Sequence, residues 1–390
     1  MNSIINIPFH KPIIPDSFNE ILSNSIKNGW LTTGSQVSQF EKIISKYTNS
    51  DNLIAVSSCT AALHLALAAK GFGPGDKFIA PTFTFVSSVE VGEYLGMEPI
   101  LIDCDEDYNM NIEAIYSLLQ KDISIRAIIP VHFAGKPVDM KRILLIAQEF
   151  DLFVLEDAAH ALEAVSNLGK VGNTNYATAF SFYANKNITT AGEGGAIATN
   201  DNKLADKIRK LSLHGMSKDG WNRFKTGSKW EYDIGDLGYK YNMTDISAAF
   251  GIWQMNNIYQ WYQKRSSIFR IYQDSFKKIS GIVCPIPAKD DEKHAFHLYI
   301  IRMVPSKWSI DRNKMIELLN KGGIGTSVHY KPVHMHSYYQ RKYEYNPTDY
   351  PNSIKFYENV ISLPLYPSLK DKQINYIVEF VTKLWEKYKS

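Results

Sequence analysis

Cysteine is scarce in this chain of 390 residues, and signals for export or membrane insertion are missing. The three cysteines, Cys59, Cys104 and Cys284, lie far apart and match no disulfide or zinc spacing. The opening stretch, MNSIINIPFHKPIIPDS, lacks the basic and apolar regions of a signal peptide, and no apolar run is long enough to cross a membrane. We therefore expect a cytoplasmic protein without a membrane partner.

The chain also lacks a large excess of positive or negative charge. The net charge is only +3, and the lysines are scattered, so the basic patch that a nucleic-acid partner requires is not expected. No G-x-G-x-x-G follows a predicted strand, which argues against a nicotinamide enzyme. The stretch GFGPGDK has the wrong spacing for a P-loop, and Phe78 follows it where serine or threonine is needed.

Metal ligands are not grouped as a metal site requires. The stretch HYKPVHMH, residues 329–336, contains three histidines, but Pro332 is incompatible with the helix on which zinc ligands are commonly spaced. We expect no metal site. A loop that lines a pocket is the favoured interpretation, with His329 and Tyr330 as substrate-binding residues.

Alternating patterns between residues 53 and 200 predict an α/β fold. Apolar runs predict strands at 53–58, 76–85, 98–105, 125–133, 152–161 and 195–200, and amphipathic stretches predict helices at 60–71, 111–122, 139–151 and 202–215. Helices between buried strands imply a mostly parallel sheet with both faces covered. We expect a large domain at 1–255 and a smaller C-terminal α+β domain at 256–390.

Chemically suggestive residues follow several of these strands. Residues 58–60, residues 83–85, His132 and Asp157 all stand at predicted carboxyl ends. Because ligands of open α/β sheets bind beyond those ends, we expect one shared site.

Each of these residues also has a purely structural interpretation. The small polar residues in SSCTAALH suit a phosphate at a helix N-terminus, but Thr60 could equally be a helix cap. Asp157 could bind a metal, a ribose or a protonated ring nitrogen, or it could cap a helix. His160 could share the site or be a packed core histidine.

Lys186 lies in the stretch FSFYANKNITTAGEGG, residues 180–195. Its aromatic neighbours suggest that it leaves an apolar strand, and desolvation lowers the pKa of an amine and frees its lone pair. A nucleophilic lysine, a carboxylate and a phosphate-binding turn match the aldehyde, the ring nitrogen and the phosphate of pyridoxal 5′-phosphate.

The order of motifs along the chain resembles the DegT/DnrJ/EryC1/StrS family of nucleotide-sugar aminotransferases. The resemblance covers nearly the whole chain and rests on GWLTTGSQVSQFE, SSCTAALHLALAAKGFGPGD, PTFTFVSS, PVHFAGKPVDM, LEDAAHALEA, FSFYANKNITTAGEGG, LGYKYNMTDISAAFG, GIGTSVHYKPVH and ISLPLYP. It implies the type I fold of pyridoxal-phosphate enzymes, with a mostly parallel seven-stranded sheet in the large domain.

The resemblance also implies residue roles. Lys186 would form an imine with the cofactor and shuttle a proton, and Asp157 would pair with the pyridine nitrogen. The remaining cofactor contacts would come from Phe85 on the ring, His160 near the 3′-oxygen, and Cys59, Thr60 and Ser181 at the phosphate. Lys240 and Asn242 would reach the phosphate of the partner subunit in a homodimer. Glu193 is left unassigned because its spacing from the lysine is longer than in some relatives.

The implied activity is transfer of an amino group from L-glutamate to a nucleotide-linked keto sugar. The stretches YKYN, HAFHLYIIR and GIGT look most like the branch that aminates a UDP-linked 4-keto pentose, as in amino-sugar synthesis for lipopolysaccharide or O-antigen. The alternatives are a 3-keto sugar, a keto-inositol or a non-catalytic cofactor-binding regulator. A sugar 3-dehydratase is disfavoured because it carries histidine where Lys186 stands. Aromatic residues of the loop 217–233 could contact a sugar, a base or a dimer partner.

Overall fold

The computed structural model describes residues 6–27, 29–122, 124–216 and 232–390. Most of the loop predicted to contact a ligand or a partner, residues 217–231, lies outside these ranges. Within them, none of the helices combines the length and the apolar character needed to span a bilayer.

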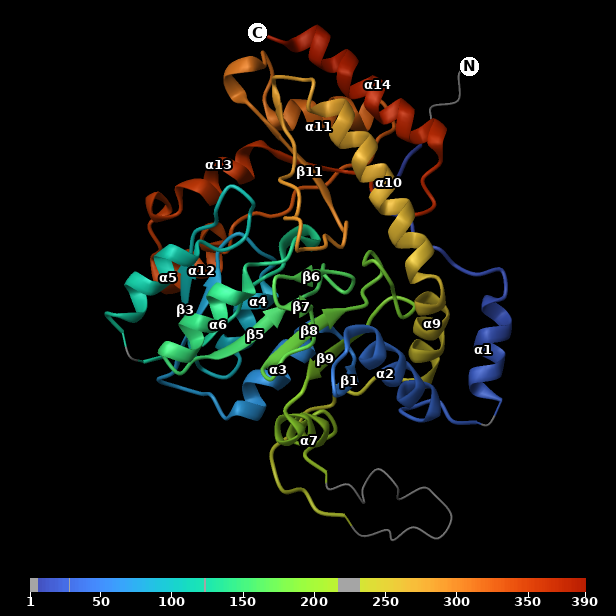
Figure 1. The fold of residues 1–390 in the computed structure, drawn as a ribbon, viewed down its shortest axis with the longest axis vertical. Coiled ribbons are helices and arrows are strands. Elements are labelled where there is room, and N and C mark those ends of the chain that lie inside the picture. Colours follow the sequence, from blue (N-terminus) through green and yellow to red (C-terminus); the bar gives the residue numbers. More distant parts are fainter. Residues whose placement is uncertain (1–5, 28, 123, 217–231) are drawn as a thin grey trace.

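A seven-stranded sheet forms the centre of the molecule (Figure 1). Its strands are β1 (Asn52–Val56), β2 (Lys77–Pro81), β3 (Glu98–Ile102), β4 (Ile125–Ile128), β5 (Phe153–Asp157), β8 (Ala177–Ser181) and β9 (Gly195–Thr199). Their spatial order is β1-β9-β8-β5-β4-β2-β3, and β9 runs in the direction opposite to the other six strands. The predicted α/β class and the mostly parallel sheet are therefore confirmed.

Helices cover both faces of the sheet, as the buried strands require. The helices of this half are α1 (Phe18–Ile26), α2 (Ser35–Thr48), α3 (Cys59–Lys70), α4 (Ser87–Glu93), α5 (Ile112–Leu119), α6 (Met140–Glu149), α7 (Asn202–Leu211) and α9 (Asp245–Asn256). Successive strand residues point to opposite faces. Leu155 packs in the core with α3 and α7, whereas Val154 packs with α5 and α6.

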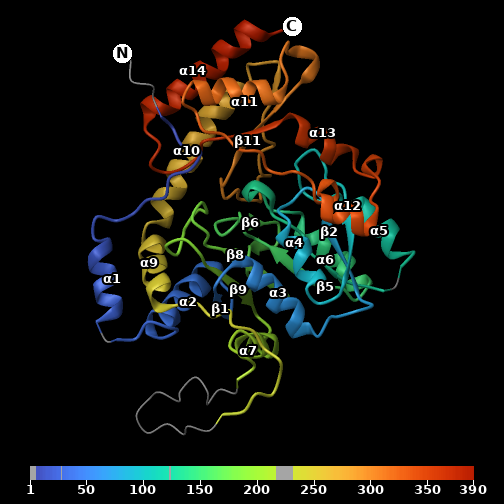
Figure 2. The ribbon, with the colours of Figure 1, turned by 180° about the vertical axis from the view of Figure 1, so that it is seen from behind.

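The C-terminal part has a separate sheet and core. Its helices and strands are α10 (Ile258–Phe276), β10 (Ile282–Val283), β11 (Tyr299–Met303), α11 (Arg312–Lys321), α12 (Ser337–Tyr343), α13 (Pro351–Asn359), β12 (Val360–Leu363) and α14 (Asp371–Tyr388). The three strands pair antiparallel, and α10, α11 and α14 supply most of the surrounding apolar side chains. Figure 2 shows α10 leading from α9 to this second core.

The N-terminal segment joins the C-terminal core. Ile7 is fully buried there, and its backbone forms a bridge with Ile324. In the opposite direction, Val333 and Tyr339 pack in the core beside α3. The division of the chain at 255/256 into two domains stays a prediction.

A buried ion pair links α10 to the large sheet. Arg265 of α10 pairs with Glu163, which lies in the segment after β5, and each residue is 2 % exposed. Glu163 also accepts a hydrogen bond of 2.6 Å from Asn187, the neighbour of Lys186. Removal of one partner would leave an uncompensated charge in the interior.

We predict that Glu163→Ala lowers the free energy of unfolding by about 3–5 kcal/mol. The measurement is the midpoint of thermal or urea unfolding. Glu317→Ala is a suitable control, because Glu317 pairs with Lys314 on the surface and surface ion pairs contribute little. An unchanged midpoint for Glu163→Ala would show that the buried pair does not hold α10 in place.

Candidate active site

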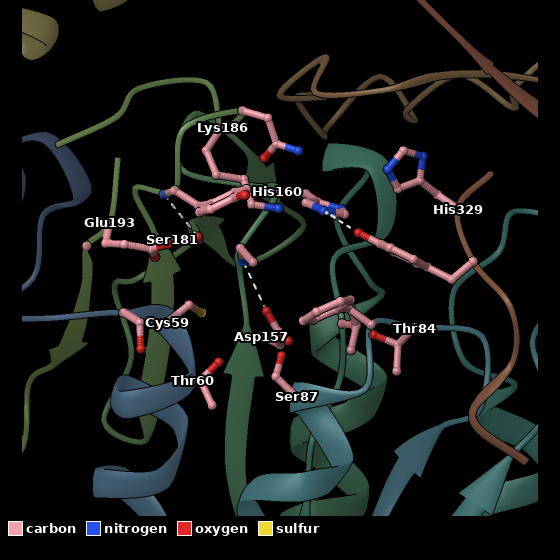
Figure 3. A pocket seen from close by; sticks show the side chains of 18 residues that line it. Cys59, Thr60, Thr84, Ser87, Asp157, His160, Ser181, Lys186, Glu193 and His329 are labelled. Atoms are coloured by element: carbon pink, nitrogen blue, oxygen red, sulfur yellow. Dashed lines mark hydrogen bonds between the residues drawn. The ribbon is translucent and has the colours of Figure 1, made fainter. Parts of the chain in front are cut away.

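A cavity of about 490 Å³ lies at the edge of the large sheet where the parallel strands end. Its wall is formed by residues after β1, β2, β4, β5 and β8, and by His329 and Tyr330 of the C-terminal part. Because β9 is antiparallel, its amino end lies at the same edge and adds Glu193 and Gly194. The cavity therefore lies at the strand ends, where the sequence predicted a shared site (Figure 3).

Most residues predicted for the site line this cavity. They are Cys59, Thr60, Phe85, Asp157, His160, Ser181, Lys186, His329 and Tyr330. Three chain segments more than 70 residues apart in sequence thus meet at one place.

Lys186 is held by a turn after β8. Its backbone N–H donates to the carbonyl of Tyr183 at 2.9 Å. The residue as a whole is partly exposed to the cavity, but burial around the amine lowers the pKa of Lys186 to about 8. The nearby Asp157 carboxylate favours the charged amine and so limits this shift. With a pKa of about 8, about a tenth of the amine is neutral at pH 7, far more than for an ordinary lysine.

Asp157 ends β5 and is 4 % exposed. Its Oδ1 accepts the backbone N–H of Ala159 at 3.0 Å, and its Oδ2 accepts the hydroxyl of Ser88 at 2.6 Å. Burial raises the pKa of the Cys59 thiol well above its usual range, so that thiol stays neutral. Asp157 is then the carboxylate whose charge acts on the Lys186 amine, and both residues belong to the cavity of Figure 3.

The N-terminus of α3 forms another part of the wall. Ser58 caps the helix, because its Oγ accepts the backbone N–H of Ala61 at 3.0 Å. The alternative in which Thr60 is the cap is therefore wrong, since the helix already begins at Cys59. The first N–H groups of a helix have no partner within it, so they and the Thr60 hydroxyl are available to an anion.

Gly195 allows β9 to approach this helix end closely. A Cβ at this position would lie 2.3 Å from the carbonyl carbon of Ser58 and 2.5 Å from the nitrogen of Cys59. No side chain fits in that space, so glycine at position 195 is required for the close contact between β9 and α3 that forms this part of the cavity wall.

His160 and Tyr330 form a hydrogen-bonded pair. Nδ1 of His160 accepts the backbone N–H of Ala134 at 3.2 Å, and Nε2 lies 3.1 Å from the Tyr330 hydroxyl. Burial lowers the pKa of His160 well below its usual value, so the ring is neutral. Its single proton must then be on Nε2 and be donated to Tyr330, which leaves the phenol proton free to point elsewhere.

The remaining aromatic residues line the cavity in different ways. Phe85 is 56 % exposed, unusual for phenylalanine, and its ring lies 5.9 Å from that of Tyr330. His329 is buried, its Nδ1 lies 2.7 Å from the Ser362 hydroxyl, and burial lowers its pKa to about 3. An exposed flat ring and two neutral histidines suit a planar ligand.

Four predicted positions lie away from the cavity, and one of them, Phe83, packs with Phe133 and Leu298 in the core. His132 is fully buried, and its Nε2 lies 2.9 Å from Oε2 of Glu156 in the core. Lys240 and Asn242 bond to each other, and Asn242 also donates to Thr33 at 2.8 Å. These two residues do not line the cavity of their own chain.

Thr84, in the predicted stretch 83–85, also lines the cavity, but two neighbouring serines were not predicted. Ser87 lines the cavity, and Ser88 contacts Asp157 from behind it. The polar run in PTFTFVSS was the available signal, because serine and threonine are uncommon inside an otherwise apolar segment. Among the described residues, no group of three or more metal-ligating side chains is found.

Comparison with known proteins places the chain in a family. Residues 12–382 match the DegT/DnrJ/EryC1/StrS aminotransferase family. The spore coat polysaccharide biosynthesis protein SpsC of Bacillus subtilis is 42 % identical over 96 % of each chain. The UDP-4-amino-4-deoxy-L-arabinose–oxoglutarate aminotransferase of Shewanella sediminis is 33 % identical over 97 % of this chain and 98 % of its own.

A solved structure agrees with these relatives. The putative sugar aminotransferase Spr1654 of Streptococcus pneumoniae, in its PMP-form, superposes with a TM-score of 0.90 at 33 % identity, covering 98 % of this chain and 100 % of its own. The chain therefore belongs to the DegT/DnrJ/EryC1/StrS aminotransferase family. It is an aminotransferase of the type I fold, as the sequence motifs predicted.

We predict that Lys186 of the cofactor-free protein reacts with an amine-acylating reagent with a midpoint near pH 8. Burial disfavours the charged amine, so the neutral, reactive form appears more than two pH units below an ordinary lysine. The measurement is mass spectrometry of the peptide that contains Lys186 over a pH series. Lys314 is the control, because its bond to Glu317 raises its pKa. A midpoint near pH 10 for both lysines would contradict the assigned burial.

Proposed function

We propose that this aminotransferase uses pyridoxal 5′-phosphate to move an amino group from L-glutamate to the keto group of a nucleotide-linked sugar. The observation that carries the proposal is the partly neutral lysine that shares a cavity with a buried carboxylate and a helix N-terminus. Spr1654, a relative in fold and sequence, has been solved in PLP-form and PMP-form.

The residues of the cavity fit this cofactor. The glycine at the start of β9 lets that strand pack directly against the N-terminus of α3, where a Cβ would collide with the backbone, and this contact shapes the wall beside the helix end. Thr60, Ser181 and the backbone at Cys59 would bind the phosphate. The exposed ring of Phe85 would cover one face of the pyridine, and His160 would lie near the 3′-oxygen.

Bound pyridoxal phosphate supplies an aldehyde that condenses with amines and a ring that accepts electrons from the carbon next to the nitrogen. Lys186 would hold the cofactor through Nζ. Once substrate has displaced it, the same Nζ would accept the proton from Cα of the amino donor and deliver it to the cofactor carbon. A pKa near 8 suits this exchange, because a base acts best when its pKa lies near the working pH.

Asp157 would keep the ring nitrogen protonated. Both of its oxygens already accept hydrogen bonds, from Ala159 and Ser88, which fix the orientation of the carboxylate that a cationic ring would meet. A carboxylate fixed in advance stabilises charge that develops in the transition state without reorganisation.

The sugar substrate is proposed from the relatives. SpsC is a polysaccharide biosynthesis protein, and the Shewanella sediminis relative is named for UDP-4-amino-4-deoxy-L-arabinose and oxoglutarate. We favour the C4 keto group of a UDP-linked sugar, in the synthesis of a surface polysaccharide or lipopolysaccharide. His329 and Tyr330 would contact that substrate, since both line the cavity. A 3-keto sugar and a keto-inositol stay alternatives.

A homodimer is part of the proposal. Lys240 and Asn242 lie outside the cavity of their own chain, and Lys240 is exposed. In a homodimer, these two side chains would bind the phosphate of the cofactor held by the partner subunit.

We predict that glutamate alone converts the visible absorbance of the holoenzyme to that of the pyridoxamine form, and that a UDP-linked 4-keto sugar restores it. Borohydride treatment before glutamate should leave a pyridoxyl group on Lys186 alone, as read by peptide mapping. dTDP- and GDP-linked keto sugars serve as the comparison panel. Absence of a spectral change with every amino donor would refute the transaminase assignment, and a label on another residue would refute the role of Lys186.

We predict that Asp157→Asn still binds the cofactor but loses about 10²–10³-fold in kcat. Asparagine keeps the size of the side chain and removes the charge that holds the ring protonated. The measurement combines the absorbance of bound cofactor with steady-state turnover. Turnover close to that of the native enzyme would remove Asp157 from the proposed role.

A further inference from the structure

Two hydroxyl groups stand behind the carboxylate of Asp157. Ser88, at the second position of α4, is fully buried and donates to Oδ2 of Asp157 at 2.6 Å. Its oxygen lies 3.1 Å from the Oγ1 of Thr84, which is 2 % exposed and contributes to the cavity wall. The chain Thr84–Ser88–Asp157 thus runs from the wall to the carboxylate.

The direction of this chain follows from proton counting. An ionised carboxylate only accepts hydrogen bonds, so the single hydroxyl proton of Ser88 must go to Asp157. Ser88 is then the acceptor of its other contact, and Thr84 must be the donor. Hydroxyl groups that donate in series polarise one another, so the bond to the carboxylate is strengthened.

The two oxygens of Asp157 are held from different segments. The backbone N–H of Ala159 fixes Oδ1 from the chain just after β5, whereas Ser88 fixes Oδ2 from α4. Rotation of the carboxylate would break one of these bonds inside a buried region. The plane of the carboxylate is therefore set before any ligand binds.

We propose that Ser88 is a positioning residue that keeps a shared proton on the cofactor ring nitrogen rather than on Asp157. This inference rests on the proposed function of Asp157. With the proton on nitrogen, the ring is cationic and the carboxylate anionic, and with the proton on oxygen both groups are neutral. A donor to Oδ2 stabilises only the first arrangement, because it binds the anionic oxygen more strongly.

The experiment uses holoenzyme loaded with cofactor labelled with ¹⁵N in the ring, without substrate. The ¹⁵N chemical shift reports where the proton lies, and turnover is not needed. In Ser88→Ala we expect the ratio of protonated to unprotonated ring nitrogen to fall by about tenfold, the effect of one lost hydrogen bond to a charged group. A role in packing alone would leave this shift unchanged.

Two further variants keep the test decisive if Ser88→Ala folds poorly. Ser88→Thr retains the hydroxyl and should restore the native chemical shift. Thr84→Val is nearly isosteric and removes only the donor to Ser88, so it should move the shift in the same direction by a smaller amount. The thermal midpoint of each variant separates loss of fold from displacement of the proton.

Asp157→Asn in the same measurement separates this inference from the function on which it rests. If Asp157→Asn displaces the ring-nitrogen signal and Ser88→Ala does not, the role of Ser88 is refuted while Asp157 keeps its assignment. If neither variant displaces the signal, Asp157 is not the partner of the ring nitrogen and both assignments fall. A shift in Ser88→Ala that Ser88→Thr reverses supports the inference.

Discussion

The cavity depends on the opposition of one amine and one carboxylate in a region with little water. Burial removes the proton from part of the Lys186 population, and the nearby charge of Asp157 keeps that shift moderate. Neither group could be held this way on a surface loop, because water would restore ordinary behaviour. The sheet supplies the constraint. β5 and β8 are adjacent and parallel, so the residues that follow them lie side by side in the same cavity wall.

Alternation of apolar and amphipathic stretches was sufficient to predict the class of fold and the identity of most strands. The strands are shorter than predicted, however. The apolar pattern at 76–85 continues beyond Pro81, where β2 ends, and that at 125–133 continues beyond Ile128, where β4 ends. Beyond these points the regular strands end, although Val131 still forms a bridge with Asp157. The chain stays buried against the C-terminal part, as Phe83 and Phe133 do with Leu298. Hydrophobic pattern reports burial, and it cannot tell a strand from a buried connection.

The same distinction explains which site residues could be found from sequence. Lys186 and Asp157 stand out because a charged side chain next to a buried apolar strand is costly unless it has a partner or a function. His132 met the same criterion, yet its partner is the core residue Glu156, and only the three-dimensional structure shows that its ring turns away from the cavity. Ser88 gave the opposite problem. The polar run around Ser88 is visible in the sequence, but its contact with Asp157 spans 69 residues, so the sequence does not show which residue Ser88 binds.

The neutral histidines of the wall have a consequence for how the site meets its ligands. His160 and His329 stay uncharged because burial makes their protonation unfavourable, and their hydrogen bonds suit the neutral ring. Acidification within the range that cells tolerate therefore adds no positive charge to this side of the cavity. A molecule that carries phosphate groups meets an electrostatic potential to which backbone dipoles, Lys186 and the carboxylates of Asp157 and Glu193 contribute. Modest changes of proton concentration leave the histidine contribution to that potential constant.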